Sequence, residues 1–326
     1  MSFNEAITAP PQRRAKLADY IAIMRLDHAT KHVFIVPGII LALLLRGAQA
    51  HLNLWSFIAG ALVAVLIASA NYVINEWLDR ESDAHHPTKS ARTAVKIHLN
   101  GRFVWLQWSI LVAVGLLVAA SSSKAMLFIA AAFAAQGIIY NVKPLRSKDY
   151  AYVDVLTESV NNPLRLMIGW AMVDPSTLPP SSILIGYWLG GAFLMGAKRL
   201  SEYREIVAGH GRDLLVRYRS SFRGYDEMKL TSSCLVYALT SVMALAIFFV
   251  KYRIEYIFVL PAIAILFGQY LALSMQPTST AQKPEQLFRE RRLMLIVLAI
   301  VVIFAICTVV NMPFLEPLTS QRYIGL

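Results

Sequence analysis

The chain has 326 residues, of which 57% are hydrophobic and only 16% are charged, and its formal net charge is +11 at pH 7. So apolar a composition excludes an ordinary soluble protein and indicates an integral membrane protein. The basic residues fall in alternate loops between apolar runs, so we expect the positive charge to serve a membrane and its ligands, with no nucleic acid as partner.

Residues 1–29 precede the first apolar run and form a predicted cytoplasmic or interfacial segment. They contain no short apolar core followed by a small-residue cleavage site, so they are not a secretory signal. Residues 14–27 can form an amphipathic helix on the inner face of the bilayer. Lys31 stands at the start of the first apolar run, where a cation can reach the headgroups.

Nine apolar runs follow, and each is a candidate transmembrane helix. They cover residues 31–48, 54–78, 103–121, 124–141, 151–172, 181–197, 230–250, 254–274 and 293–312. Most of the 31 Lys and Arg residues lie in the loops on one side of these runs, which the positive-inside rule places in the cytoplasm. We therefore predict an all-α bundle of nine transmembrane helices with cytoplasmic cap loops, forming one domain over residues 30–326.

The second run ends in three side chains that carry oxygen and are spaced four residues apart, Asn75, Asp79 and Asp83. Residues at this spacing share one face of a helix. Two carboxylates held together beside a membrane repel each other unless they share a cation. Hard oxygen ligands completed by substrate phosphates are typical of a Mg²⁺ site. A charged helix end at the membrane surface is the plainer interpretation of this spacing.

The loop after this motif favours the metal site, because Lys89 and Arg92 suit a phosphorylated ligand bound to the metal. His85 and His86 also lie in this loop, and we interpret both as solvated, since a Mg²⁺ ion bound to phosphate prefers oxygen.

Two later inner segments are also rich in ionisable residues. The loop after the fourth run contains Arg146 and Lys148, and the fifth run carries Asp154, Glu158 and Arg165, which must face a cavity or the bundle interior. The sixth run ends in a basic stretch that begins a long cytoplasmic loop. Its candidate site residues are Lys198, Arg199, Glu202 and Tyr203.

With these motifs in view, the chain resembles the UbiA superfamily of intramembrane prenyltransferases, and within it the decaprenyl-phosphate phosphoribosyltransferases of arabinan precursor synthesis. The resemblance rests on Asn75-x-x-x-Asp79-x-x-x-Asp83, on the HPTK run at 86–89 with Arg92, and on FLMGAKRLSEYRE at 193–205. It covers about residues 20–230. Glu76 and Thr93 depart from the family pattern, as does the second acidic pair, Asp154 with Glu158.

The resemblance implies transfer of 5-phosphoribose from phosphoribosyl pyrophosphate to a decaprenyl-like polyprenyl phosphate at the cytoplasmic face of a bacterial inner membrane, as a step towards the lipid donor of cell-envelope arabinan. It implies Mg²⁺ on Asp79 and Asp83, with Asn75 completing the site. It also implies that Lys89, Arg92, Lys198 and Arg199 hold the donor phosphates, while Arg146, Lys148 and Arg165 serve either substrate. Glu202 is expected to bind a ribose hydroxyl or to orient Lys198 and Arg199, and homo-oligomerisation is left open.

Two other functions remain alternatives from the sequence. The first is a UbiA-type transferase that moves a prenyl group from its diphosphate to an aromatic acceptor and uses the same acidic site. The second is a transporter without chemistry, against which the acidic site at a membrane face argues. The number of cations around the acidic site favours phosphoribosyl transfer, since two anionic substrates need several.

Overall fold

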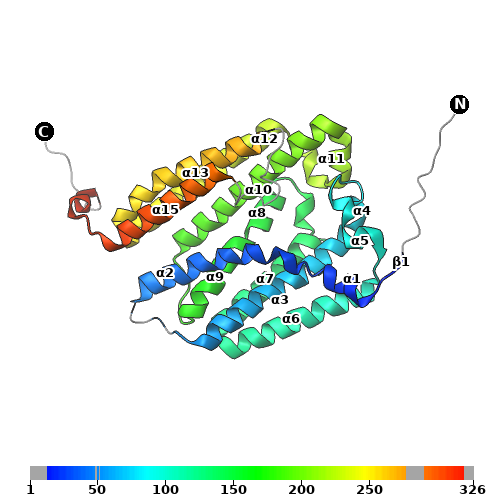
Figure 1. The fold of residues 1–326 in the computed structure, drawn as a ribbon, viewed down its shortest axis with the longest axis horizontal. Coiled ribbons are helices and arrows are strands. Elements are labelled where there is room, and N and C mark those ends of the chain that lie inside the picture. Colours follow the sequence, from blue (N-terminus) through cyan, green and yellow to red (C-terminus); the bar gives the residue numbers. More distant parts are fainter. Residues whose placement is uncertain (1–12, 48–49, 51, 277–289, 319–326) are drawn as a thin grey trace.

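The structure is a computed structural model that describes residues 13–47, 50, 52–276 and 290–318. It is almost entirely helical, and its long helices run between two ends of one bundle (Figure 1). In chain order the helices are α1 (Leu17–Ala22), α2 (Val36–Arg46), α3 (Leu54–Leu78), α4 (Arg80–Asp83), α5 (Thr93–Lys96), α6 (Gly101–Ser122), α7 (Lys124–Asn141), α8 (Val153–Ser159), α9 (Asn161–Val173), α10 (Ser181–His210), α11 (Arg212–Tyr218), α12 (Glu227–Tyr252), α13 (Val259–Ser274) and α15 (Arg291–Val309).

Short 3₁₀ segments and one pair of strands connect these helices. The 3₁₀ segments are η1 (Leu26–Ile35), η3 (Lys89–Ala91), η4 (Ser147–Asp149), η5 (Ser220–Arg223), η6 (Ile254–Phe258) and η8 (Pro313–Leu318). Strand β1 (Arg13–Arg14) pairs in parallel with β2 (Ile97–His98). This pairing fastens the start of the described chain to the segment that follows the acidic motif.

Six helical segments in the described part of the chain are long and apolar enough to cross a membrane: Leu54–Leu78, Gly101–Ser122, Lys124–Asn141, Glu227–Tyr252, Ile254–Ser274 and Arg291–Val309. Each coincides with one of the predicted runs. The other three predicted runs differ from the structure in extent. The first begins as the 3₁₀ segment η1 before α2, the fifth is divided into α8 and α9, and the sixth continues as α10 to His210.

Proline explains why the fifth run is divided. The proline ring of Pro163 has no N–H to donate to the carbonyl of Ser159, so the hydrogen-bond ladder is interrupted there. The ladder resumes when Leu164 N donates to Val160 O at 3.2 Å. The break separates the acidic turn that carries Asp154 and Glu158 from the apolar helix below it.

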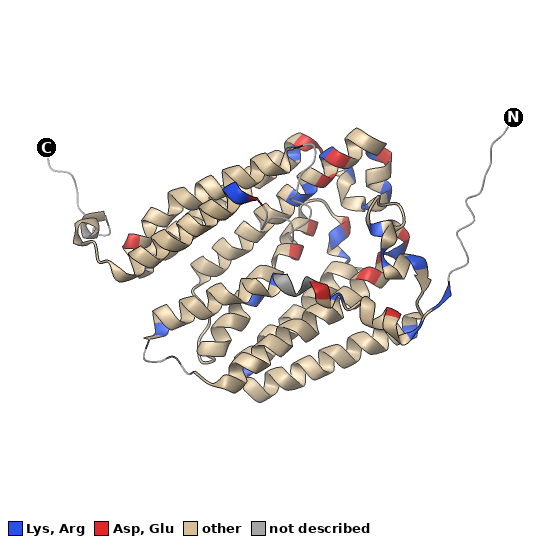
Figure 2. Ribbon diagram, in the orientation of Figure 1, with Lys and Arg blue, Asp and Glu red and all other residues tan. Residues whose placement is uncertain are grey.

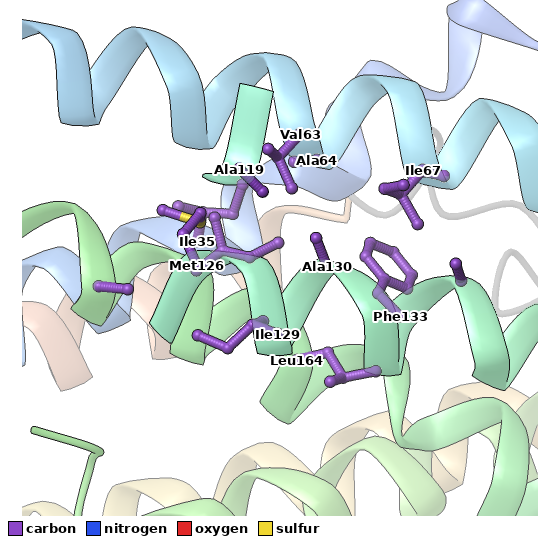
Figure 3. Packing of buried hydrophobic residues seen from close by; sticks show 14 of the residues in the cluster. Ile35, Val63, Ala64, Ile67, Ala119, Met126, Ile129, Ala130, Phe133 and Leu164 are labelled. Carbon is purple, nitrogen blue, oxygen red and sulfur yellow. The ribbon is translucent and has the colours of Figure 1, made fainter. Parts of the chain in front are cut away.

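One large apolar core lies between α3, α6, α7 and α9, and Figure 3 shows its packing. Val63, Ile67, Met126 and Phe133 are among its buried members. Because lipid tails are as apolar as these side chains, close packing stabilises contacts between membrane helices more than water exclusion does. The core therefore fixes the positions of the helices that carry the acidic motifs.

Glycine permits a close backbone contact between the η1–α2 segment and α9. A Cβ added to Gly38 would lie 2.0 Å from Leu166 O, and one added to Gly169 would lie 2.1 Å from Ile35 O. The two backbones thus touch on both sides of the contact, which only small residues allow.

Charged residues gather at one end of the bundle. Figure 2 shows most of the Lys, Arg, Asp and Glu around α4, α5 and α11 and along the upper turns of α8 and α10, whereas the opposite end carries few. This distribution matches the charge asymmetry predicted from the sequence and puts the acidic motifs at one mouth of the bundle.

Candidate active site

Asp79 lies at the end of α3, where the helix gives way to α4. Its carboxylate oxygen Oδ1 is 2.6 Å from Lys148 Nζ and 3.0 Å from Arg146 Nη2. Both cations come from the η4 loop. Burial alone would raise the pKa of Asp79, but Lys148 and Arg146 outweigh it and hold that pKa below its ordinary value. The predicted basic loop therefore does meet the acidic motif.

Asn75, one turn before Asp79, completes this wall of the site. Its amide Nδ2 donates to Asn141 Oδ1 at 2.6 Å and lies 3.4 Å from Asp79 Oδ2. Asn141 Oδ1 also accepts from Lys148 Nζ at 2.8 Å. Asn141 is thus a positioning residue that the sequence analysis did not identify, since an asparagine at a helix end carries no distinctive signal.

Asp83 ends the short helix α4 and is bound by a different cation. Its Oδ2 is 2.5 Å from Arg92 Nη1, and its side chain is almost fully buried. Burial raises the pKa of Asp83 and the neighbouring Asp79 adds to the rise, although Arg92 opposes both. The two aspartates are therefore close enough to repel each other while each is bound by its own cation.

Glu76 contacts the loop that carries Arg92 and is buried. Its Oε1 accepts from Ala94 N at 3.3 Å, and its Oε2 is 4.0 Å from Arg25 Nε. Glu76, which departs from the family pattern, is therefore a buried residue that supports this loop.

His86 is buried, so the expectation that it is a solvated loop histidine is wrong. Its Nδ1 accepts from Thr88 N at 3.1 Å and from Lys89 N at 3.2 Å, and its Nε2 lies 3.2 Å from Glu202 Oε1. Its ring packs edge-on against Tyr218. His86 folds the HPTK turn, and no sequence signal distinguished it from the exposed His85 beside it.

Glu202 on α10 joins the two halves of the site. Besides His86, its Oε1 accepts from Lys89 Nζ at 3.1 Å, and its Oε2 accepts from Arg199 Nη1 at 3.0 Å. Burial lowers the pKa of Lys89 to about 8, although Glu202 opposes that shift. Of Lys198 and Arg199, the two residues that Glu202 was expected to orient, it contacts Arg199.

The guanidinium of Arg199 binds three carboxylates. Its guanidinium lies 3.3 Å from Asp154, 2.8 Å from Glu158 and 3.0 Å from Glu202, and the side chain is 2% exposed. A guanidinium with these partners has no face open to a phosphate. We therefore regard Arg199 as a positioning residue that fixes α8 against α10, and we do not assign it to the donor phosphates.

Arg219 is a second cation at this acidic pair and was missed as a site residue. It lies 3.4 Å from Asp154 Oδ2 and donates to Tyr140 Oη at 2.6 Å, and Tyr140 in turn donates to Glu158 at 2.7 Å. Tyr225 also donates to Asp154, at 2.7 Å. The long loop after α10 therefore folds back as a structured cap over the acidic pair.

The remaining predicted residues divide between the site and its surroundings. Lys198 has no hydrogen bond or ion pair within the described residues, and it lies within electrostatic range of Glu158, Lys31 and Lys89. Tyr203 is not brought to the acidic residues. It packs with Phe222 in the apolar cap, 6.4 Å between ring centres.

The donor set at the mouth fits a hard divalent cation. In the described ranges no group of three or more His, Cys, Asp or Glu side chains could hold a metal ion. Asp79 and Asp83 supply two carboxylates, whereas Asn75 presents its amide nitrogen to Asp79 and Asn141 and could offer its oxygen to a metal only after the amide turns. A site with so few protein ligands suits Mg²⁺, which keeps waters and takes substrate phosphates as further ligands.

Comparison with known proteins gives the fold and the family match. The model of the UbiA prenyltransferase family matches residues 35–297. A solved UbiA homolog from Archaeoglobus fulgidus bound to DMAPP and Mg²⁺ is 18% identical with a TM-score of 0.66, covering 90% of this chain and 100% of its own. The form bound to GPP and Mg²⁺ is 19% identical with a TM-score of 0.65, covering 89% of this chain and 100% of its own. A digeranylgeranylglyceryl phosphate synthase is 15% identical with a TM-score of 0.62, covering 90% of this chain and 98% of its own. No curated protein matches.

Proposed function

This chain belongs to the UbiA prenyltransferase family, and from that premise we propose that it transfers 5-phosphoribose from phosphoribosyl pyrophosphate to a polyprenyl phosphate. The reaction releases pyrophosphate and depends on Mg²⁺. The enzyme is thus a pentosyltransferase built on a prenyltransferase fold. Its product serves as a precursor of a lipid-linked arabinofuranose donor for the cell envelope.

The excess of cations over carboxylates at one mouth of the bundle carries this proposal. Asp79 and Asp83 are bound by Lys148, Arg146 and Arg92. Further cations lie in the same region, namely Lys89, Lys198 and Arg219, and Lys31 and Arg165 lie beside Tyr72, about two helical turns before Asp79 on α3. A prenyl diphosphate and a neutral or singly charged acceptor need few of these, whereas a pyrophosphate, a sugar phosphate and a lipid phosphate need several.

The proposal includes a nine-span topology. Six segments are long and apolar enough to cross a membrane. The bundle is completed by α2 with η1, by α8 with α9, and by α10. The basic mouth then faces the cytoplasm of a bacterial inner membrane by the positive-inside rule. From that side the water-soluble donor enters, while the lipid acceptor arrives through the bilayer.

Asp79 and Asp83, with the Asn75 oxygen, are the residues that would hold Mg²⁺. The metal, when bound there, supplies charge neutralisation for the leaving pyrophosphate. Lys148, Arg146 and Arg92 stand next to the same carboxylates and can turn their donors to the phosphate oxygens. Lys89 and Lys198 reach the same region from the HPTK turn and α10.

The transfer itself needs no strong base from the protein. The bond between ribose C1 and the pyrophosphate oxygen breaks, and its electron pair leaves with pyrophosphate. An oxygen of the polyprenyl phosphate, already anionic at neutral pH, forms the new bond to C1. The protein therefore contributes orientation and fixed positive charge to a transition state that develops positive charge on the sugar and negative charge on the leaving group.

The second candidate is transfer of a prenyl group from its diphosphate to an aromatic acceptor. It is favoured by the solved relatives in the same fold, two of which bind DMAPP or GPP with Mg²⁺. Both functions use the acidic mouth for the same leaving group, so the donor and acceptor must be tested directly.

The test uses the purified full chain in lipid nanodiscs with Mg²⁺ and a polyprenyl monophosphate. Phosphoribosyl pyrophosphate labelled in the ribose should deliver label to the lipid phase and release unlabelled pyrophosphate. No transfer under these conditions, together with labelled product from prenyl diphosphate and an aromatic acid, would replace the proposal with the second candidate.

A further inference from the structure

Arg165 differs from every other buried cation in the described part of the chain. Three Lys or Arg residues are buried there, Lys148, Arg165 and Arg199. Lys148 is paired with Asp79, and Arg199 is paired with three carboxylates. Arg165, 5% exposed, has no carboxylate partner among the described residues. A cation buried without a counter-charge is costly and marks a functional site by default in a membrane protein.

The donors of Arg165 are also incompletely used. Its Nη1 lies 3.3 Å from the Asn161 carbonyl oxygen, and its guanidinium stacks over the Phe133 ring at 5.3 Å. Its Nε is buried without a hydrogen-bond partner. His32 Nδ1, on the neighbouring η1 segment, is also buried without one and lies within electrostatic range of Arg165. Two unused nitrogens therefore lie around one position in the bundle.

Tyr72 of α3 places a second cation at this position. Lys31 Nζ lies 5.3 Å from the centre of the Tyr72 ring, and Arg165 interacts electrostatically with the same tyrosine. Tyr72 thus lies beside both a half-buried lysine and a buried arginine, and its side chain is hydrogen-bonded to the arginine. An anion placed near Tyr72 would be attracted by both cations.

The position lies deeper in the membrane than the acidic mouth. Tyr72 precedes Asp79 by seven residues on α3, which is about 10 Å along a helix. Around it the walls are apolar, because Phe133, Leu164 and Ile168 belong to the large core. A soluble sugar phosphate would have to bury its ribose hydroxyls here, whereas the head of a polyprenyl lipid would bring an apolar chain that suits these walls.

We propose that Arg165, with Lys31 and His32, forms the subsite that binds the phosphomonoester head of the polyprenyl acceptor, separate from the Mg²⁺ and pyrophosphate site at Asp79 and Asp83. The inference rests on the proposed function for the identity of the acceptor. Arg165 binds the lipid phosphate and leaves one of its oxygens directed to the mouth, where the donor carbon lies.

The test measures equilibrium binding of farnesyl monophosphate to the wild type and to Arg165→Met in nanodiscs, with no donor present. The variant should bind it at least about tenfold more weakly, since a charge-assisted hydrogen bond is lost. Its ligand-free melting temperature should stay the same or rise, because an uncompensated buried charge is removed. Arg102→Met removes an exposed cation at the same end of the bundle and should change neither quantity.

Two further arms identify the source of the phosphate. Ribose 5-phosphate binding, and Mg²⁺-dependent binding of phosphoribosyl pyrophosphate, should be unchanged in Arg165→Met and weakened in Lys148→Met. Loss of ribose 5-phosphate binding in Arg165→Met, or unchanged farnesyl monophosphate binding, overturns the assignment. In the wild type, farnesyl monophosphate should bind together with the donor. Competition between these two ligands would also overturn the assignment of Arg165, and this measurement does not depend on the folding of the variant.

Failure of the proposed function gives a different result. If the wild type binds farnesyl monophosphate through Arg165 but never transfers phosphoribose, the subsite stands and the donor assignment falls. If phosphoribose is transferred but the variant keeps its affinity for the lipid phosphate, the function stands and the subsite falls.

Discussion

Lys89 Nζ lies 3.1 Å from Glu202 Oε1, and this contact joins the loop after the first acidic motif to the helix that carries the second basic stretch. The two residues are 113 positions apart in the chain. Because Glu202 also binds Arg199, which binds Asp154 and Glu158, one carboxylate connects both acidic motifs. The site is therefore a single charge network and not two separate halves.

Replacing Glu202 by Gln should weaken this network and lower activity. The change removes the carboxylate bound to Lys89 and one of the three bound to Arg199, so we expect a loss of about 3–5 kcal/mol in the free energy of unfolding. A double-mutant cycle with Lys89→Met should give a coupling of about 0.5–3 kcal/mol, measured by thermal unfolding. Glu205→Gln, exposed and nearly one turn further on α10, is the control. Additive effects of the two changes would mean that the contact contributes nothing.

Asp79→Asn and Asp83→Asn should each abolish turnover and remove Mg²⁺-dependent donor binding. The loss follows from the missing carboxylate, since an amide neither neutralises the cation nor repels its neighbour. Glu81→Gln, on the short helix α4 that carries Asp83, removes an exposed carboxylate that pairs with Arg80 and should retain full activity. Donor titration calorimetry with and without Mg²⁺ checks this prediction, and wild-type rates in either aspartate variant would rule out the metal site.

Donor affinity should fall as pH rises through about 8. Burial lowers the pKa of Lys148 to about 8, although Asp79 opposes that shift, and burial lowers the pKa of Lys89 to about 8 as well. Above that pH each lysine must take up a proton to bind an anion, which costs up to about tenfold in affinity per pH unit for each. Lys148→Arg keeps its charge and should make the alkaline decline shallower.

Stability should change in the opposite sense over the same pH range. Lys148 has an ordinary pKa of 10.5 when unfolded and about 8 when folded, so the unfolded chain binds more protons between these values. The ligand-free protein therefore gains stability from this lysine as pH rises from about 8 to 10.5. A parallel loss of stability and donor affinity would instead indicate general alkaline unfolding.

Gly38→Ala and Gly169→Ala should destabilise the bundle. Each new methyl group would meet a backbone carbonyl at about 2 Å, so η1 with α2 must move away from α9. Overpacking of this kind costs about 1–3 kcal/mol or more. Gly268→Ala, on α13 with nothing within 4 Å, should be nearly neutral. Thermal unfolding in detergent measures all three, and equal melting temperatures would show that the close contact is not essential.

Lys198→Ala should raise the KM for phosphoribosyl pyrophosphate more than the KM for the lipid phosphate. Lys198 has no ion pair in the described ranges and lies within electrostatic range of Glu158 and of Lys89, which we assign to the donor phosphates. Steady-state kinetics with each substrate varied in turn would measure the two effects. An equal rise in both values would contradict the assignment to the donor.

The sequence predicted the helical bundle and the charged residues gathered at its mouth because both depend on local patterns. Apolar run length located six helices that satisfy the requirements for spanning, and the spacing of Asn75, Asp79 and Asp83 located the acidic motif. Which cation binds which acid was not predictable, because Lys148, Arg92 and Arg199 meet their partners through loops and tertiary packing.

Two errors had different origins. The break between α8 and α9 was visible in the sequence as Pro163. It was missed because the run was located from the hydropathy of the whole segment, which a single proline hardly changes. The burial of His86 had no comparable signal, since it depends on Tyr218 and Glu202, which lie far along the chain. Arg219 was hidden for the same reason within a loop of many basic residues.

The ion pairs at Asp79 have a consequence for the order of events in a catalytic cycle. With Lys148 and Arg146 already in contact with this carboxylate, two positive charges stand against one negative charge, and a bare dication arriving alone would be repelled and would have to displace both. A dication that arrives already chelated by the pyrophosphate group offers those displaced cations new anionic oxygens. Metal and donor should thus enter as one complex, and free metal should have little affinity for the resting enzyme.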